Sequence, residues 1–169
     1  GDITLKNCIF ANSMYATLFA NVTDSSIKLM DNTMSTTWRG FYFEKNVTGS
    51  SITTTGNSIA NLQAEGGVHF QSPLDDCVVE VSDNTITDSM YGVCASGEVK
   101  DTQFDVIGNT FDGGVEGVYT KDSGDGVCGT SVLTVEDNTF IGQSDSGVYI
   151  EYVDRNGSAE VTDNTITGS

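Results

Sequence analysis

Aromatic side chains recur at one position of the sequence pattern, and their type suits contact with a sugar ring or with a protein partner. Each lies within a short run that opens with glycine, two residues after that glycine, as in Gly40-Phe41-Tyr42. The residues at this position are Tyr42, His69, Cys94, Tyr119 and Tyr149. Rings on one face can pack against sugars or partners, although tyrosines on a sheet surface also stack on one another. The predicted carbohydrate or partner contacts are Trp38, which precedes the column in one copy, with Tyr42, His69, Tyr119 and Tyr149.

The titratable residues form no pattern that is typical of catalysis. His69 is the only histidine, and without a second histidine or a cysteine pair at metal spacing it does not predict a zinc site. Asp75 and Asp76 are adjacent, so on a strand their side chains would point to opposite faces. The four cysteines contain no C-x-x-C pair, and their spacing assigns no disulfide pairing. We therefore expect no catalytic residues.

Two acidic patterns invite comparison with calcium sites. Aspartates at 31, 83, 137 and 163 share one repeat position, but glycine replaces them at 56 and 108. Aspartate and glycine are both ordinary turn residues, so this column is interpreted as a turn. The segment from Asp122 to Asp125 resembles part of a calcium loop but lacks its further spaced carboxylates. We expect no cofactor, with calcium at Asp122 and Asp125 as the only candidate.

Three segments match the acceptor motif for N-glycosylation, which is Asn-x-Ser/Thr. They begin at Asn21, Asn46 and Asn156. The first two occupy the same place in their copies of the repeat, which predicts glycans along one edge of the protein. Chance matches are the alternative in a chain this rich in asparagine and threonine. Used sites would place the protein outside the cell or on the cell surface.

A repeat that runs along the whole chain positions all of these residues. The phrase Asp/Gly-Asn-Thr/Ser-apolar recurs, with successive asparagines 25 to 29 residues apart. Its asparagines are Asn7, Asn32, Asn57, Asn84, Asn109, Asn138 and Asn164. Such self-similarity is typical of stacked copies of one supersecondary unit. Asparagine tolerates tight bends, and its amide can hydrogen-bond to the next copy. We predict that these seven residues form an asparagine ladder at one bend.

Each repeat also contains three short apolar runs. The first run precedes the asparagine and alternates apolar and polar residues, as in Val79-Glu80-Val81. Such alternation predicts a strand with one buried face. An apolar residue such as Ile86 follows the asparagine by two positions, and the glycine-led run comes third. Three short strands in each copy describe a coil whose strands pair in parallel with the coils above and below. We predict an all-β parallel β-helix, or solenoid, of about seven coils.

On these repeats the sequence resembles the right-handed parallel β-helix family. That family includes pectate-lyase-like enzymes, phage tailspikes, many surface proteins and periplasmic copper-maturation proteins. The resemblance covers essentially the whole chain and implies a right-handed solenoid, but the fold hosts many functions. A leucine-rich horseshoe and an antiparallel sandwich fit less well, because the leucine signature is absent and a sandwich would not keep one period.

The resemblance also supplies a catalytic comparison. Lyases of this family use an acidic calcium site with an arginine or lysine base, and the hydrolases use Asn-Thr-Asp, His-Gly and Arg-x-Lys motifs. Here Asn-Thr is followed by Met, Ile or Phe, His69 is followed by Phe70, and Arg-x-Lys is absent. These departures argue against transferring the enzymes' active sites. In such relatives the third-strand sheet often lines a substrate groove, which favours the predicted contact surface.

Composition limits the partners. The chain has 7 Lys+Arg against 24 Asp+Glu, a net charge of −17. Nucleic acids and anionic membranes require a basic face, and no apolar run approaches the roughly 18 residues of a membrane span. We therefore expect no nucleic acid and no membrane insertion.

The combined expectation is a single solenoid domain over residues 1–169, as a section of a longer protein or a filament subunit. Its function would be that of a non-catalytic extracellular structural or adhesive protein that presents glycans and an aromatic stripe. Its partners would be neighbouring solenoid subunits, end to end, and carbohydrate. The alternatives are a carbohydrate-binding or carbohydrate-active β-helix, and a periplasmic maturation protein that handles metal through cysteine and histidine.

Overall fold

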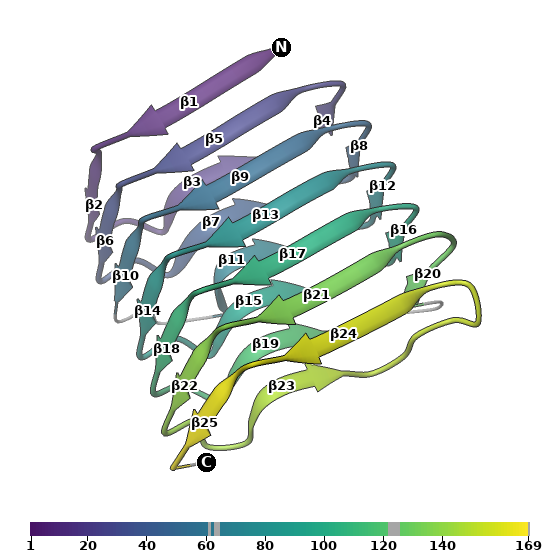
Figure 1. Cartoon of the computed structure of the whole chain (residues 1–169). Helices are drawn as coiled ribbons and strands as arrows, with labels where there is room; N and C mark the ends of the chain where they lie inside the picture. Colours follow the sequence, from purple (N-terminus) through teal and green to yellow (C-terminus); the bar gives the residue numbers. More distant parts are fainter. Residues whose placement is uncertain (61, 63–64, 122–125, 169) are drawn as a thin grey trace.

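Parallel strands stacked in successive coils build the described chain (Figure 1). The computed structural model describes residues 1–60, 62, 65–121 and 126–168. Every strand in these ranges pairs in parallel with its counterpart one coil away. The prediction of an all-β parallel β-helix is confirmed, and its number of turns, about six, is close to the expected seven.

Four sheets, named A to D here, run along the solenoid. Sheet A contains β1 (Asp2–Lys6), β5 (Ser26–Met30), β9 (Ser51–Thr55), β13 (Val78–Ser82), β17 (Gln103–Ile107), β21 (Val132–Glu136) and β24 (Ser158–Thr162). Sheet B contains β2 (Ile9–Ala11), β6 (Thr33–Ser35), β10 (Ser58–Ala60), β14 (Thr85–Thr87), β18 (Thr110–Asp112), β22 (Thr139–Ile141) and β25 (Thr165–Thr167). Sheet C contains β3 (Tyr15–Phe19), β7 (Arg39–Phe43), β11 (Gly66–Phe70), β15 (Tyr91–Ala95), β19 (Glu116–Thr120) and β23 (Ser146–Ile150). Sheet D contains β4 (Val22–Thr23), β8 (Val47–Thr48), β12 (Leu74–Asp75), β16 (Val99–Lys100) and β20 (Val127–Cys128).

Sheet D is an addition to the expected three strands in each coil. Its strands are two residues long, and the first residue of each is a buried apolar side chain. Alternation over two residues is too short to be recognised as a strand in a sequence. The buried residues are Val22, Val47, Leu74, Val99 and Val127.

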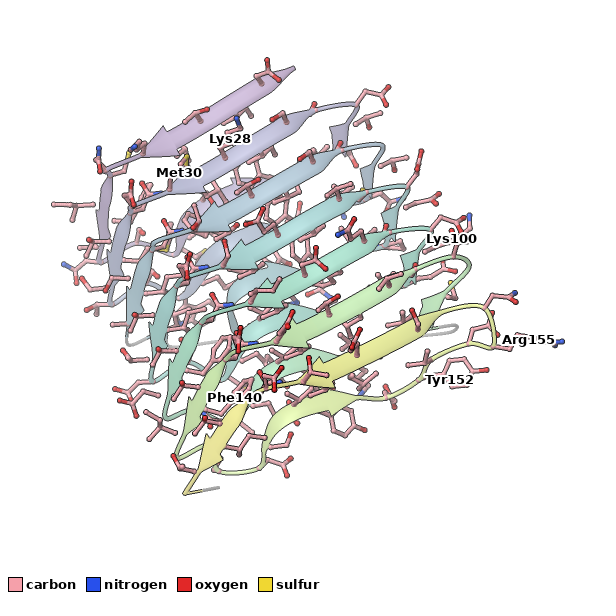
Figure 2. The ribbon with its side chains drawn as sticks, in the orientation of Figure 1. Lys28, Met30, Lys100, Phe140, Tyr152 and Arg155 are labelled. Atoms are coloured by element: carbon pink, nitrogen blue, oxygen red, sulfur yellow. The ribbon has the colours of Figure 1, made fainter. Side chains whose placement is uncertain are left out.

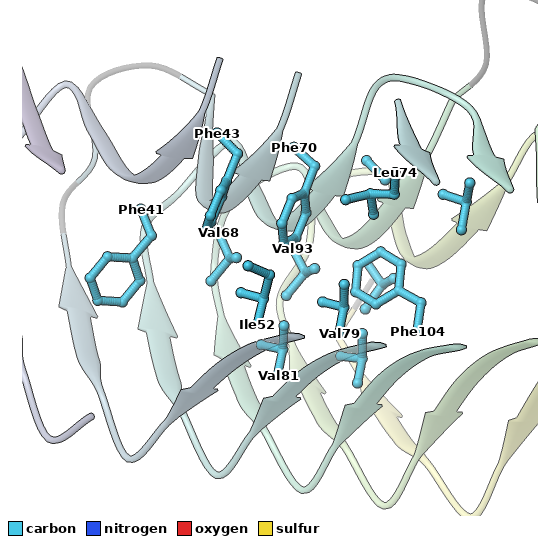
Figure 3. Packing of buried hydrophobic residues seen from close by; sticks show 14 of the residues in the cluster. Phe41, Phe43, Ile52, Val68, Phe70, Leu74, Val79, Val81, Val93 and Phe104 are labelled. Atoms are coloured by element: carbon cyan, nitrogen blue, oxygen red, sulfur yellow. The ribbon is translucent and has the colours of Figure 1, made fainter. Parts of the chain in front are cut away.

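The interior is a continuous apolar column (Figure 3). Side chains of sheets A and C point toward one another across it, as Phe70 and Phe104 do with ring centroids 5.7 Å apart. Phe43 and Phe70, in successive coils, stack at 4.6 Å. Because each coil buries its side chains against its neighbours, stability arises from nearest-neighbour contacts. No helix in the described part of the chain is long and apolar enough to cross a bilayer.

The bend between sheets A and B has a left-handed residue in every coil. Its φ angle is 54° at Asp31, 66° at Gly56 and 55° at Asp83. From the second coil on, this position is aspartate or glycine, because both adopt this conformation more readily than most residues. The backbone thus explains the acidic column as a turn.

The next residue at this bend carries the ladder. The side-chain amide of each asparagine donates to the side-chain oxygen of the next, at 2.9 to 3.0 Å, from Asn32 through to Asn164. That oxygen also accepts the backbone N–H of the preceding ladder residue.

The prediction that Asn7 belongs to the asparagine ladder is wrong. Asn7 occupies the left-handed position of its bend, with φ 56°. Cys8 occupies the ladder position, and its N–H donates to Asn32 Oδ1. The first coil keeps the strand-to-bend spacing of the second, because Lys6 pairs with Met30 and Ile9 with Thr33. Its asparagine therefore stands one position before the ladder.

Candidate functional site

The third-strand residues form one outward column on sheet C. Strand pairing places Tyr42 beside His69, His69 beside Cys94, and Tyr119 between Cys94 and Tyr149. Flanking residues such as Val118 enter the core. The structure therefore brings together four of the five predicted contact residues, and Trp38 lies elsewhere.

The first residues of this column are buried and its last residue is exposed. Tyr42 and His69 are only 4% and 2% exposed, whereas Tyr149 is 40% exposed. Tyr15 stacks on Tyr42 with ring centroids 5.5 Å apart, and the Arg39 guanidinium lies 4.3 Å from the Tyr42 ring centroid. The expectation of an open aromatic stripe is thus corrected, because side chains on the same face cover its first half.

The second half contains a stack of tyrosines. The Tyr91 and Tyr119 ring centroids lie 4.6 Å apart, and those of Tyr119 and Tyr149 lie 5.3 Å apart. The rings cover one another's faces, so mainly their edges and hydroxyl groups remain available for contact. Burial raises the pKa of Tyr119 to about 12, which keeps its hydroxyl protonated. Tyr91 was absent from the prediction, yet its place directly before the strand glycine marks it as an outward residue.

A depression of about 310 Å³ opens beside this stack. It lies over β11, β15 and β19, and the residue before β11, Glu65, reaches it as well. Its lining combines aromatic rings with a carboxylate, an imidazole, a hydroxyl and an ammonium group, from Glu65, His69, Tyr91, Ser96, Tyr119 and Lys121. Concave sites of this composition bind small polar ligands, because rings supply contact area and a few polar groups fix orientation.

A chain of polar contacts forms part of this lining. Glu65 Oε2 lies 2.7 Å from Arg39 Nε and 3.0 Å from His69 Nδ1. On the other side of the ring, His69 Nε2 lies 3.0 Å from Ser96 Oγ. Burial lowers the pKa of His69, Glu65 opposes this shift and Arg39 adds to it. The imidazole is therefore neutral at neutral pH.

Sequence reasoning did not find Glu65 or Ser96 as partners of His69. Ser96 lies 27 residues after His69, directly after β15. That separation approximates one repeat, so a search for polar residues one coil from the histidine would have found it. Glu65 precedes its strand and is brought to the histidine by the corner before β11.

A buried carboxyl group lies farther along the same face. Glu116 pairs with Tyr91 in adjacent strands and is 6% exposed. Burial raises its pKa, and the nearby Asp145 carboxylate raises it further.

Trp38 belongs to a different surface. It is 48% exposed and lines a cavity of about 340 Å³ with Met14 and Thr36, at the corner between sheets B and C. This corner shares no lining residue with the depression on sheet C. Trp38 and Tyr149 therefore do not belong to one ligand-contact surface.

The predicted glycosylation residues are exposed. Asn21 and Asn46 precede β4 and β8, and the Val22 N–H donates to the Asn46 carbonyl at 3.1 Å. They therefore lie one above the other at the same corner. Asn156 is exposed between β23 and β24, in the segment that contains Tyr152 and Arg155 (Figure 2).

The weak calcium candidates, Asp122 and Asp125, lie outside the described residues. Within the described ranges, no group of three or more His, Cys, Asp or Glu side chains could hold a metal ion.

Acidic side chains cover much of the outer surface. Glu80 and Asp105 are neighbours on sheet A, and Lys28 on the same sheet and Lys100 on sheet D are among the few basic groups (Figure 2). This distribution favours a neutral or basic partner over an anionic one.

Comparison with known proteins gives one match. A family model described as a right handed beta helix region matches residues 1–111. No curated protein and no solved structure matches the chain.

Proposed function

The chain belongs to the right-handed β-helix family, and from that premise we propose that it is an adhesive scaffold that binds carbohydrate on the outer face of sheet C. The observation that carries the proposal is the depression beside the stack of Tyr91, Tyr119 and Tyr149. A rigid solenoid holds these side chains in fixed register, so little conformational entropy is lost when a ligand binds.

The chemistry of the depression favours a neutral saccharide. Tyrosine edges and hydroxyls, the Glu65 carboxylate and the Lys121 ammonium group offer both donors and acceptors. The surrounding charge of −17 disfavours polyuronates. The proposed ligand class is therefore a neutral polysaccharide or glycan.

The proposal places the protein outside the cell or on the cell surface. Exposed sequons at Asn21 and Asn46 support this location, because N-glycosylation acceptor motifs are used in surface loops of secreted proteins. End-to-end contact with other solenoid subunits is part of the same proposal, since terminal coils of solenoids offer strand edges.

Binding without cleavage of glycosidic bonds is the expected behaviour. The purified chain would be titrated with a panel of neutral and anionic polysaccharides, and the release of reducing ends would be followed in the same samples. We expect saturable binding to one or more neutral polysaccharides and no release of reducing ends. Absence of binding across the panel, or cleavage of any bound polysaccharide chain, would contradict the proposal.

A further inference from the structure

Three side chains from two coils are arranged as an acid–base–nucleophile series in the depression on sheet C. Glu65 Oε2 lies 3.0 Å from His69 Nδ1, and His69 Nε2 lies 3.0 Å from Ser96 Oγ. A nucleophilic hydroxyl next to an imidazole, which is itself oriented by a carboxylate, is the arrangement that activates serine for acyl transfer.

We propose that Ser96 is a nucleophile, His69 its general base and Glu65 the residue that positions His69, in hydrolysis of short acyl esters. The inference shares the depression with the proposed function but requires no carbohydrate, and it replaces the expectation that the chain has no catalytic residues. It concerns ester bonds only and leaves the glycosidic bonds of a ligand intact.

The tautomer of His69 suits this role. The Glu65 carboxylate beside Nδ1 favours a proton on that nitrogen, which leaves Nε2 to accept the hydrogen bond from Ser96. Arg39 Nε lies 2.7 Å from the same carboxylate oxygen, at ion-pair distance. Cys94 Sγ lies 3.2 Å from Ser96 Oγ, and burial raises the pKa of this thiol to about 12. The thiol therefore stays protonated and can donate to Oγ.

The reaction balances with water as the only co-substrate. Ser96 Oγ attacks the ester carbonyl carbon while its proton moves to His69 Nε2. The bond from that carbon to the alcohol oxygen then breaks, and the alcohol leaves with the proton from His69. Water then attacks the acyl-serine while one of its protons moves to His69. The bond from the acyl carbon to Ser96 Oγ breaks, His69 returns the proton to Oγ, and the carboxylic acid leaves. Lys121 lines the same depression and is the cation available to the oxyanion.

The dimensions and lining of the depression limit the substrate. Its volume of about 310 Å³ lies near the lower end of the range for ligand pockets. Tyr91 and Tyr119 provide an aromatic wall for a small acyl group. We expect acetyl esters to be hydrolysed faster than long-chain esters.

The test uses p-nitrophenyl acetate hydrolysis and labelling with a fluorophosphonate, located by peptide mass spectrometry. The wild-type protein should carry the label on Ser96, and Ser96→Ala should abolish labelling and reduce hydrolysis to the uncatalysed rate. His69→Gln should lower the rate roughly 10²- to 10⁴-fold. The matched control is Ser72→Ala, because Ser72 is also half-buried but its hydroxyl donates to the Glu44 carbonyl at 2.9 Å. This control should behave as wild type.

A pH profile separates the roles further. The rate should rise with pH through a midpoint below 6.5, because burial lowers the pKa of His69. Glu65→Gln should move that midpoint to lower pH, since Glu65 raises the pKa of His69. Equal hydrolysis by wild type and Ser96→Ala, or labelling that His69→Gln leaves unchanged, would overturn the proposal. Neither result would bear on polysaccharide binding, which is measured separately.

Discussion

Asn84 Nδ2 donates to Asn109 Oδ1 at 3.0 Å, and the same oxygen accepts the backbone N–H of Asn84 at 2.9 Å. One side chain thus satisfies two buried donors of the coil before it. Asn84 in turn accepts from the backbone and side-chain N–H groups of Asn57, and donates to the Thr54 carbonyl.

Asn84→Ala should destabilise the solenoid strongly. The substitution removes a partner from two buried groups, the Asn57 backbone N–H and the Thr54 carbonyl. The Asn57 side-chain amide still donates to the carbonyls of Leu29 and Thr55. Each buried unsatisfied group costs about 1–3 kcal/mol, so we expect a loss of roughly 2–5 kcal/mol in the free energy of unfolding. Urea denaturation measures this loss. Thr85→Ala, at an exposed neighbour, should change stability by less than about 0.5 kcal/mol. Equal effects from the two variants would refute a structural role for the ladder.

Gly92→Ala should destabilise more than Gly142→Ala. A methyl group at residue 92 would overlap the Phe111 ring and the Gly117 carbonyl oxygen. At Gly142, whose φ is +66°, nothing lies within 4 Å of the added carbon. Gly142→Ala should therefore lose only the free energy of placing a side chain in the left-handed conformation, about 1–2 kcal/mol. Gly92→Ala should lose more than this. Thermal melting of both variants checks this order, and the reverse order would contradict the packing described for sheet C.

Glu116→Gln should stabilise the protein at neutral pH. The pKa of Glu116 is raised by burial and by Asp145, so the folded state binds the proton more tightly than the unfolded state does. Stability from this group is complete below the unfolded pKa, near 4.5, and falls as pH rises through the higher folded pKa. Glutamine at residue 116 carries no titrating group, so the variant does not lose this stability as the pH rises.

The measurement is the difference in melting temperature between Glu116→Gln and wild type as a function of pH. It should be close to zero below pH 4.5 and positive at neutral pH. Glu160→Gln, at an exposed residue of β24, should show no such trend. A Glu116→Gln variant that is less stable than wild type at neutral pH would show that the carboxylate is not penalised by its surroundings.

Asn21 and Asn46 should carry N-linked glycans when the chain is made in a secretory pathway. Their side chains emerge from neighbouring coils, which are about 4.8 Å apart in such sheets. Two glycans so close should hinder each other's attachment. Glycopeptide mass spectrometry should show no glycan at residue 21 in Asn21→Gln and a higher occupancy at Asn46 than in the wild-type protein. An unchanged mass in both Asn→Gln variants would remove the support that these residues give to a surface location.

The repeat made the fold predictable because each periodic feature has one local physical cause. Positive φ angles at residues such as Asp83 favour Asp, Asn or Gly, and the ladder uses an amide such as that of Asn84. The fourth strand was missed because two residues, such as Val47–Thr48, have no period. Asn7 was wrongly assigned to the ladder because the asparagine of the first coil stands at the left-handed position, one residue before the ladder position that Cys8 fills.

The site was only partly predictable, because alternation gives the direction of a side chain but not what covers it. Tyr42 and His69 do point outward, yet Arg39, in the same strand as Tyr42, and Glu65, directly before the strand of His69, lie over them. Such cover depends on rotamers and corner conformations, which follow no repeat.

The most direct test of the central claim is the affinity of Tyr119→Ala for a neutral polysaccharide that binds the wild-type protein. The proposed site predicts at least a tenfold loss of affinity, which corresponds to about 1.4 kcal/mol, with an unchanged circular dichroism spectrum. Tyr149→Ala, at the exposed end of the stack, should also weaken binding. Tyr152→Ala, at a residue that is 52% exposed but lies outside the depression, should bind as wild type does. Wild-type affinity in Tyr119→Ala and Tyr149→Ala would contradict the assignment of carbohydrate binding to sheet C.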